Sequence, residues 1–209
     1  MLVRNRMTEQ PATVTPEDHL DQAKAKMASG RFRRLPVVKE GVLVGIVTDR
    51  DLREHTGHFD QIKVGAVMTE TPATVAPGAT VEEAARILLR RQISGLPVVE
   101  QDRLIGIITT SDVMQAFLDV MGASVEGSTR LDFILEGEEH GLTEASRIVD
   151  REGGEILGIG TYREKVGENP VCYLRLVGGN PEKIAKGLRA AGFDVLGVHK
   201  IAVNEPRLP

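Results

Sequence analysis

An internal repeat is the feature that most restricts how this chain can fold. When the sequence is shifted by 61 residues, Met7–Leu52 aligns with Met68–Val113 without a gap, and 18 of the 46 aligned pairs are identical. Self-similarity at a fixed spacing indicates a repeated structural unit. Two similar units are therefore expected, the first at residues 1–60 and the second at 61–121.

The identical residues occur in the same order in both copies. The paired motifs are Met-Thr-Glu at 7–9 and 68–70, Pro-Ala-Thr-Val at 11–14 and 72–75, Leu-Pro-Val-Val at 35–38 and 96–99, Gly-Ile-Val-Thr at 45–48 with Gly-Ile-Ile-Thr at 106–109, and Asp51 with Asp112.

The pattern within each copy predicts the element order β-α-β-β-α. A short extended segment leads through a proline-marked turn to a helix, where Thr80 and Glu83 form a capping box in the second copy. His19 and Gln22 occupy these positions in the first copy, which is a poorer start. Two β-rich runs separated by a short polar turn then predict a hairpin, and a second helix follows it.

On these motifs, residues 7–121 resemble a pair of cystathionine-β-synthase (CBS) repeats, also called a Bateman module. The resemblance covers both units, including the Leu-Pro-Val-Val strand and the Gly-x-x-Thr-x-x-Asp motif that ends each hairpin. It implies a pair of units related by a pseudo-twofold axis, with two ligand clefts between them.

The sequence changes character after a Gly- and Ser-containing linker at residues 122–129. The following segments predict the order β-α-β-β-α-β, and Asn180 with Pro181 is a favourable helix start. This order suggests a ferredoxin-like domain at residues 130–209 and resembles the ACT domain. We therefore expect an α+β protein, a tandem CBS pair followed by an ACT-type domain, similar to the acetoin-utilisation B-type architecture.

The composition excludes several classes of protein. The net charge of −4 argues against a nucleic-acid partner, because such proteins normally present a basic surface. Cys172 is the only cysteine, which rules out an intramolecular disulfide and favours a reducing cytoplasm. The apolar runs are too short to span a bilayer, so no membrane association is expected.

Two Thr-x-x-Asp segments are the leading candidates for ligand binding. They run from Thr48 to Asp51 and from Thr109 to Asp112, each where a strand gives way to a helix. A purely structural interpretation is available, since Thr-x-x-Asp is close to a helix capping box. A carboxylate can also accept hydrogen bonds from both hydroxyls of a ribose, and Thr hydroxyls and helix amides can meet a phosphate. The two interpretations are compatible.

The family resemblance also implies which residues share each cleft. One cleft would combine the second Thr-x-x-Asp segment with the first repeat, and the other would have the reverse composition. The first set is Thr109, Ser111 and Asp112 with Thr13, Val14, Phe32 and Arg33; the second is Thr48, Arg50 and Asp51 with Ala73, Thr74, Ile93, Ser94 and Gly95.

A basic cluster makes the two clefts unequal. Arg31, Arg33 and Arg34 precede the first Leu-Pro-Val-Val strand, where the second copy has Ser94 and Gly95. Such a cluster is most often a solvated surface run, but some nucleotide-binding CBS repeats carry phosphate-contacting basic residues at this place. Phosphate contact by Arg34, and less strongly by Arg33, is therefore a second hypothesis for this cluster.

Other candidate sites are weaker. His55 and His58 have metal-ligand residue types but lie at a helix end, and no metal site is predicted. Cys172 lies in an apolar strand and is expected in the core. The loop at 137–142, where ACT domains bind effectors, has Glu139 and His140 where many ligand-binding members have Asp and Pro. Dimerisation through sheet edges is therefore at least as good an expectation for this domain as amino-acid binding.

These observations predict a non-catalytic, homodimeric regulatory sensor. No catalytic constellation is present, and a DNA-binding regulator would need a helix-turn-helix or basic arm that is not visible. The ligand is expected to contain adenosine, with AMP, ADP, ATP, S-adenosylmethionine, NAD and cyclic dinucleotides as candidates. The alternative is an oligomerisation adaptor with empty clefts that regulates a partner enzyme.

Overall fold

The computed structural model describes residues 1–134, 141–163 and 165–200, and these divide into two compact units. The first unit is Met1–Ala116 and the second begins at Phe117. Helix α4 begins in the first unit and ends in the second.

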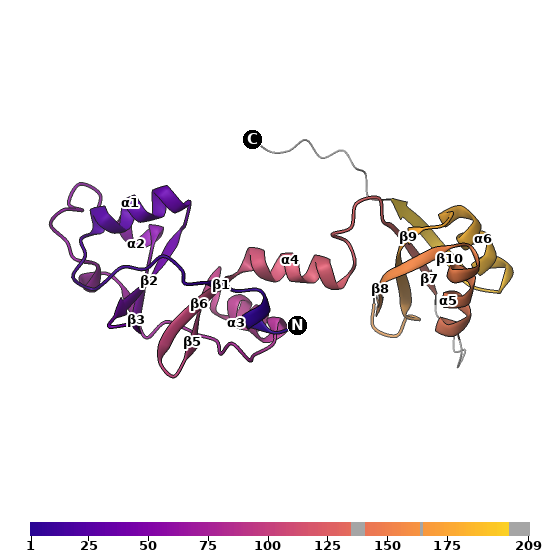
Figure 1. Cartoon of the computed structure of the whole chain (residues 1–209), viewed down its shortest axis with the longest axis horizontal. Helices are drawn as coiled ribbons and strands as arrows, with labels where there is room; N and C mark the ends of the chain where they lie inside the picture. Colours follow the sequence, from indigo (N-terminus) through magenta and orange to yellow (C-terminus); the bar gives the residue numbers. More distant parts are fainter. Residues whose placement is uncertain (135–140, 164, 201–209) are drawn as a thin grey trace. The chain divides into compact units, whose positions relative to one another are not determined.

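The first unit contains two copies of the predicted β-α-β-β-α motif (Figure 1). In the first copy the elements are η1 (Val3–Asn5), β1 (Thr8–Glu9), α1 (Leu20–Gly30), β2 (Arg34–Lys39), β3 (Val42–Thr48) and α2 (Asp49–Arg53). In the second they are η2 (Val64–Ala66), β4 (Thr69–Glu70), α3 (Val81–Arg91), β5 (Gly95–Glu100), β6 (Arg103–Thr109) and α4 (Thr110–Val120).

Both predicted hairpins and both predicted first helices are present. Strands β2 and β3 pair antiparallel, as do β5 and β6. Their two-residue turns have positive φ, 54° and 82° at Glu40 and Gly41, as hairpins with matched twist require. At the start of α1 the His19 N–H donates to Gln22 Oε1 at 2.8 Å, and at the start of α3 the Glu83 N–H donates to Thr80 Oγ1 at 3.2 Å, so each helix has one capping hydrogen bond.

The short leading strands are exchanged between the two copies. Strand β1 pairs with β6 of the second copy, and β4 pairs with β3 of the first. Glycine permits this close approach: a Cβ on Gly106 would lie 2.6 Å from Met7 Sδ, and one on Gly45 would lie 2.6 Å from Met68 Sδ. Val42 of β3 pairs with Arg103 of β6, and this pairing joins the two hairpins into one six-stranded sheet.

The apolar cores follow the same exchange. Val3 is packed with Val81, Leu96 and Ile108 of the second copy. Val64 is packed in the core of the first copy, where its N–H donates to the Asp18 carbonyl. The sequence repeat places the boundary between the copies at residues 60 and 61. Each of the two apolar cores nevertheless contains residues from both sides of that boundary.

The second unit has the order β-α-β-β-α-β. Its elements are β7 (Thr129–Ile134), α5 (Gly141–Arg151), β8 (Gly154–Tyr162), β9 (Val171–Gly178), α6 (Pro181–Ala190) and β10 (Asp194–Lys200). The four strands form an antiparallel sheet in the order β10-β7-β9-β8. Asn180 caps α6 as predicted, with Oδ1 accepting from the amides of Glu182 and Lys183.

The two helices of this unit cover one face of its sheet (Figure 1). Phe133 and Leu174 of the sheet pack against Ile148 of α5 and Leu188 of α6. The alternate residues of β7 and β9 include Asp132 and Arg175 on the opposite face, both of which are buried. Ser128 and Thr129 are also buried, so the end of the predicted linker belongs to this unit.

Candidate functional site

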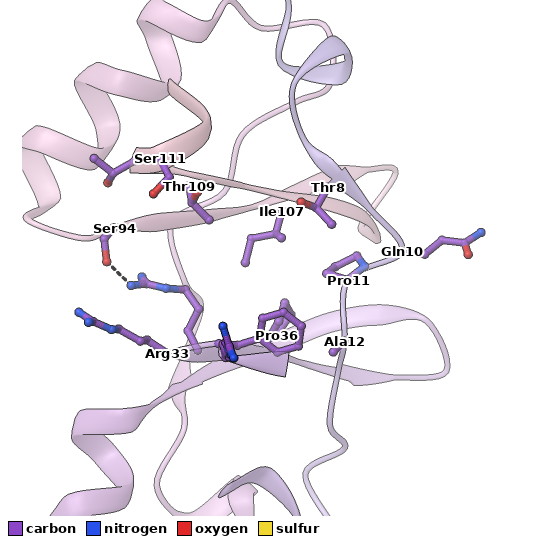
Figure 2. A pocket seen from close by; sticks show the side chains of 14 residues that line it. Thr8, Gln10, Pro11, Ala12, Arg33, Pro36, Ser94, Ile107, Thr109 and Ser111 are labelled. Carbon is purple, nitrogen blue, oxygen red and sulfur yellow. Dashed lines mark hydrogen bonds between the residues drawn. The ribbon is translucent and has the colours of Figure 1, made fainter. Parts of the chain in front are cut away.

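A cavity of about 660 Å³ lies between the two copies of the first unit (Figure 2). Its walls come from the β1 segment, the turn after α1 with the start of β2, and the end of β6 with the start of α4. The lining residues are Thr8, Gln10, Pro11, Ala12, Arg31, Phe32, Arg33, Arg34, Pro36, Ser94, Ile107, Thr109, Thr110 and Ser111.

One part of the cavity is apolar. Figure 2 shows Ile107 of β6 and Pro36 of β2 projecting toward each other across the space, with Pro11 beside them. Phe32, a residue that is 45% exposed, adds an aromatic ring. A Cβ on Gly30 would overlap this ring, so the glycine at the end of α1 allows Phe32 to lie where it does. A flat aromatic group could stack against these side chains.

The polar end of the cavity is formed by the second Thr-x-x-Asp segment. Asp112 Oδ2 accepts from the N–H and the hydroxyl of Thr109, at 2.7 and 2.6 Å. The Asp112 N–H lies 3.4 Å from Thr109 Oγ1. Both short bonds end on Oδ2, so the cap does not use the other carboxylate oxygen. The side chains of Thr109 and Ser111 line the cavity beside this carboxylate.

The first Thr-x-x-Asp segment has the same geometry. Asp51 Oδ2 accepts from the N–H and hydroxyl of Thr48 at 2.7 and 2.8 Å. In both copies, therefore, the carboxylate that completes the helix cap accepts from the threonine N–H and hydroxyl through one oxygen only. Thr48, Arg50 and Asp51 do not line the 660 Å³ cavity.

Arg34 connects the two copies. Its guanidinium donates to the Ser94 hydroxyl, shown by the dashed line at Ser94 in Figure 2. Its Cδ and Nε lie 2.9 and 3.1 Å from where a Cβ on Gly95 would stand, so Gly95 leaves the space that Arg34 occupies. Burial lowers the pKa of Arg34, Asp49 opposes that shift, and Arg33 adds to it.

The structure gathers some of the predicted site residues and separates others. Arg33, Arg34, Ser94, Thr109 and Ser111 all line the cavity, although Ser94 was expected in the opposite cleft. Asp112 is not among the lining residues, but its Oδ2 accepts from the hydroxyl of Thr109, which is.

The remaining predicted residues lie elsewhere. Val14 is buried in the first core, and Thr13 lies between it and the cavity residue Ala12. Ala73 and Thr74 line a separate cavity of about 370 Å³ with Arg90 and Arg91. Ile93 packs against the second core, and Gly95 is buried beside Arg34.

Sequence reasoning did not assign Thr8, Gln10 and Ile107 to the site. Thr8 reaches the cavity because β1 pairs with β6, where its partner is Ile107. The repeated Met-Thr-Glu motif indicated that this segment has a structural role, but it did not show which copy the segment joins.

Other candidates give no site in the described residues. No group of three or more His, Cys, Asp or Glu among them could hold a metal ion, which includes the region of His55 and His58. Cys172 is fully buried, and burial together with nearby Asp132 raises its pKa to about 11. Most of the proposed effector loop, including Glu139 and His140, lies outside the described residues. None of the described helices combines the length and apolar character needed to cross a bilayer.

Comparison with known proteins assigns the first unit. The sequence pattern of the CBS domain family matches residues 3–57 and 64–119. The chain belongs to the CBS domain family. The two matched segments are the two copies found by the internal repeat, and the 660 Å³ cavity lies between them.

Related sequences match over this CBS pair. The CBS domain-containing protein YhcV of Bacillus subtilis is 35% identical over 114 residues, which cover 53% of this chain and 81% of YhcV. An inosine-5'-monophosphate dehydrogenase of Korarchaeum cryptofilum is 41% identical over 102 residues, 48% of this chain. This match spans only 21% of the dehydrogenase.

Solved structures resemble the same part of the chain. CBSX2 in complex with AMP has a TM-score of 0.51 at 33% identity, covering 56% of this chain and 96% of CBSX2. A putative acetoin utilization protein (AcuB) from Vibrio cholerae has a TM-score of 0.52 at 34% identity, covering 56% and 90%. The CBS pair of MJ0100, bound to 5'-methylthioadenosine and S-adenosyl-L-methionine, has a TM-score of 0.52 at 28% identity, covering 56% and 95%.

Proposed function

We propose that this protein is a non-catalytic sensor whose CBS pair binds an adenosine-containing ligand in the 660 Å³ cavity. The observation that carries the proposal is the arrangement of the cavity walls. An apolar, partly aromatic end faces a polar end with the hydroxyl side chains of Thr109, Thr110 and Ser111 at the start of α4, where Thr109 is bonded to Asp112. A nucleoside has the same division into a flat base and a hydroxyl-rich sugar.

Each part of such a ligand has a counterpart in the cavity. The base would lie between Ile107 and Pro36, with Phe32 at its edge. Asp112 would accept from the ribose hydroxyls through the oxygen that its cap does not use. The hydroxyls of Thr109 and Ser111, with the amides that open α4, would contact phosphate.

The relatives support this choice of ligand. CBSX2 binds AMP, and the MJ0100 pair binds S-adenosylmethionine and methylthioadenosine. These ligands all contain an adenosine, which supports an adenosine site in the cavity of this chain. The match to the inosine-5'-monophosphate dehydrogenase of Korarchaeum cryptofilum spans 21% of that enzyme, so this likeness supports a regulatory module and not its reaction.

Binding would act by favouring one arrangement of the two repeats. Both copies supply walls of the cavity. A ligand that contacts both walls therefore binds best to one particular distance between the two copies. The contact of Arg34 with Ser94 crosses the same boundary. We propose that this change is transmitted to the second unit or to a separate target protein.

For the second unit we propose a ferredoxin-like, ACT-type domain. Its element order and its strand order β10-β7-β9-β8 support this assignment. Strands β8 and β10 are the two edges of the sheet, and either could pair with a second copy to form a C₂ dimer. The resulting CBS-ACT architecture would be of the acetoin-utilisation B type, as the likeness to AcuB over the CBS pair suggests. A monomer mass by light scattering at tens of micromolar protein would rule out the dimer.

The second candidate function is an oligomerisation adaptor that binds no nucleotide. A thermal-shift screen of the full chain against adenosine, AMP, ADP, ATP, NAD and S-adenosylmethionine separates the two. A ligand present at about one hundred times its Kd stabilises the folded state by about 2.7 kcal/mol. A shift with at least one adenosine compound is expected, whereas no shift with any of them supports the adaptor.

A further inference from the structure

The charge of the cavity is one-sided. Arg31, Arg33 and Arg34 all line it, and its lining includes no aspartate or glutamate. In the aligned repeat these three positions are Gln92, Ser94 and Gly95, none of which is charged. The second copy therefore supplies no arginine at these three positions, although Arg90 and Arg91 line the separate cavity of about 370 Å³.

The fold presents two of these arginines at the rim. Arg31 ends α1 in the left-handed region at φ 55°, and Gln92 ends α3 in the same way at φ 53°. The turn is therefore common to both copies, and only the side chain differs. Arg31 and Arg33 are both exposed, so their guanidinium groups can approach a ligand without breaking a buried contact.

Arg34 is held differently. It is half-buried and its guanidinium donates to Ser94, a neutral hydroxyl. A hydroxyl is a weaker acceptor for a guanidinium than a phosphate, because charge-assisted and bidentate hydrogen bonds are the stronger ones. A phosphate that enters the cavity would therefore compete with Ser94 for Arg34.

We propose that this cavity selects adenosine ligands that carry a chain of phosphates, and that Arg34 exchanges its hydrogen bond from the Ser94 hydroxyl to a ligand phosphate. The inference rests on the proposed function and specifies its ligand class. A single phosphate leaves most of the guanidinium donors unused, whereas di- and triphosphates carry more acceptor oxygens and more negative charge. S-adenosylmethionine, with its positive sulfonium, would face three like charges.

Calorimetric titration of the full chain with adenosine, AMP, ADP, ATP and S-adenosylmethionine tests the proposal, in low salt and without divalent metal. Affinity should rise along the series from adenosine to ATP, with ATP at least about tenfold tighter than AMP, the effect of one charged hydrogen bond. S-adenosylmethionine should bind more weakly than AMP.

The second repeat supplies substitutions that this fold already accepts. Arg31→Gln and Arg33→Ser each install the residue at the equivalent position, and Arg34→Gln removes the charge while keeping an amide donor. Each should reduce the preference for ATP over adenosine. Arg189→Gln in α6 makes the same charge change outside the cavity and should leave that preference unaltered.

Ser94→Ala tests the exchange itself. Removing the hydroxyl frees Arg34, so the preference for ATP over adenosine should increase by about three- to tenfold. An unchanged or lower preference would show that Arg34 does not transfer to the ligand.

Two further results would overturn the selection for phosphate chains. One is equal affinity for adenosine, AMP and ATP, and the other is tighter binding of S-adenosylmethionine than of ATP. Either result leaves the proposed adenosine site intact. Absence of binding by every compound would instead reject the proposed function.

Discussion

Asp112 and Thr109 form a closed pair in which one carboxylate oxygen accepts from both the backbone N–H and the hydroxyl of the threonine, at 2.7 and 2.6 Å. Asp51 and Thr48 repeat this pair at 2.7 and 2.8 Å. The two pairs are alike locally, but only Thr109 lines the 660 Å³ cavity. Both aspartates therefore support the start of a helix, but only Asp112 is bonded to a residue that lines the cavity.

Asp112→Ala and Asp51→Ala should therefore have equal effects on stability and unequal effects on ligand binding. Each removes the carboxylate that accepts from the threonine N–H and hydroxyl at the start of the helix, at a cost of about 1 kcal/mol in the free energy of unfolding. Asp112→Ala should also weaken nucleotide binding by about 1.5–3 kcal/mol, the value of a charged hydrogen bond, with a smaller loss for Asp51→Ala. Urea unfolding and calorimetric titration measure the two quantities. A larger binding loss for Asp51→Ala would move the site to the other cleft.

Gly106→Ala should destabilise the first unit. The added methyl group would stand 2.6 Å from Met7 Sδ and 3.0 Å from the Thr8 carbonyl oxygen, so β1 would have to shift away from β6. Overpacking of this kind costs about 1–3 kcal/mol. Gly78→Ala is the matched control, because the nearest atom to its Cβ is Arg4 Nη2 at 3.7 Å. Equal unfolding midpoints for the two variants would show that β1 does not pack as described.

Arg175 and Arg130 should respond in opposite directions to replacement by methionine. Arg175 is 7% exposed, and its Nε has no hydrogen-bond partner among the described residues. Burial and the neighbouring Arg130 lower the pKa of Arg175 against the attraction of Asp132, so replacing this charge by an apolar side chain should be neutral or stabilising by about 1–3 kcal/mol. Arg130 instead donates from Nε to both oxygens of buried Asp132, at 2.8 and 3.2 Å.

Arg130→Met leaves that carboxylate without its arginine and should lower stability by about 1–3 kcal/mol. Urea unfolding of both variants gives the comparison. A large loss of stability in Arg175→Met would indicate that this arginine has a partner in the intact assembly.

Cys172 should make the stability of the protein fall at alkaline pH. The pKa of its thiol is raised from 9.0 to about 11 by burial and by Asp132, so the folded state holds this proton more tightly than the unfolded state. Its contribution to stability is then complete below pH 9 and is lost as the pH rises from 9.0 toward about 11.

Cys172→Val keeps an apolar side chain of similar size and cannot titrate. The difference in unfolding free energy between wild type and this variant should therefore shift against the wild type across that pH range. A constant difference would mean that the thiol has the same pKa in both states.

Local signals were enough to predict the elements of this fold. The hairpins follow from two β-rich runs separated by a short polar turn, and α6 begins after Asn180 because this side chain accepts from free helix amides. The helix-capping interpretation of the Thr-x-x-Asp segments is confirmed by their local hydrogen bonds, whereas ribose binding by Asp51 and Asp112 stays a prediction. The 61-residue repeat required two copies of one unit, and the family match confirms this pair.

The tertiary structure decided which distant segments meet. The sequence could not show that β1 joins the second copy, because both copies carry the same Met-Thr-Glu and Gly-Ile-x-Thr motifs and either pairing satisfies them equally. That exchange brings Thr8 and Gln10 to the cavity. Nor could it show that Arg34 reaches Ser94, which depends on the space left by Gly95 in the other repeat. Such contacts depend on how two separately predictable units pack together, and packing is a property of shape in three dimensions.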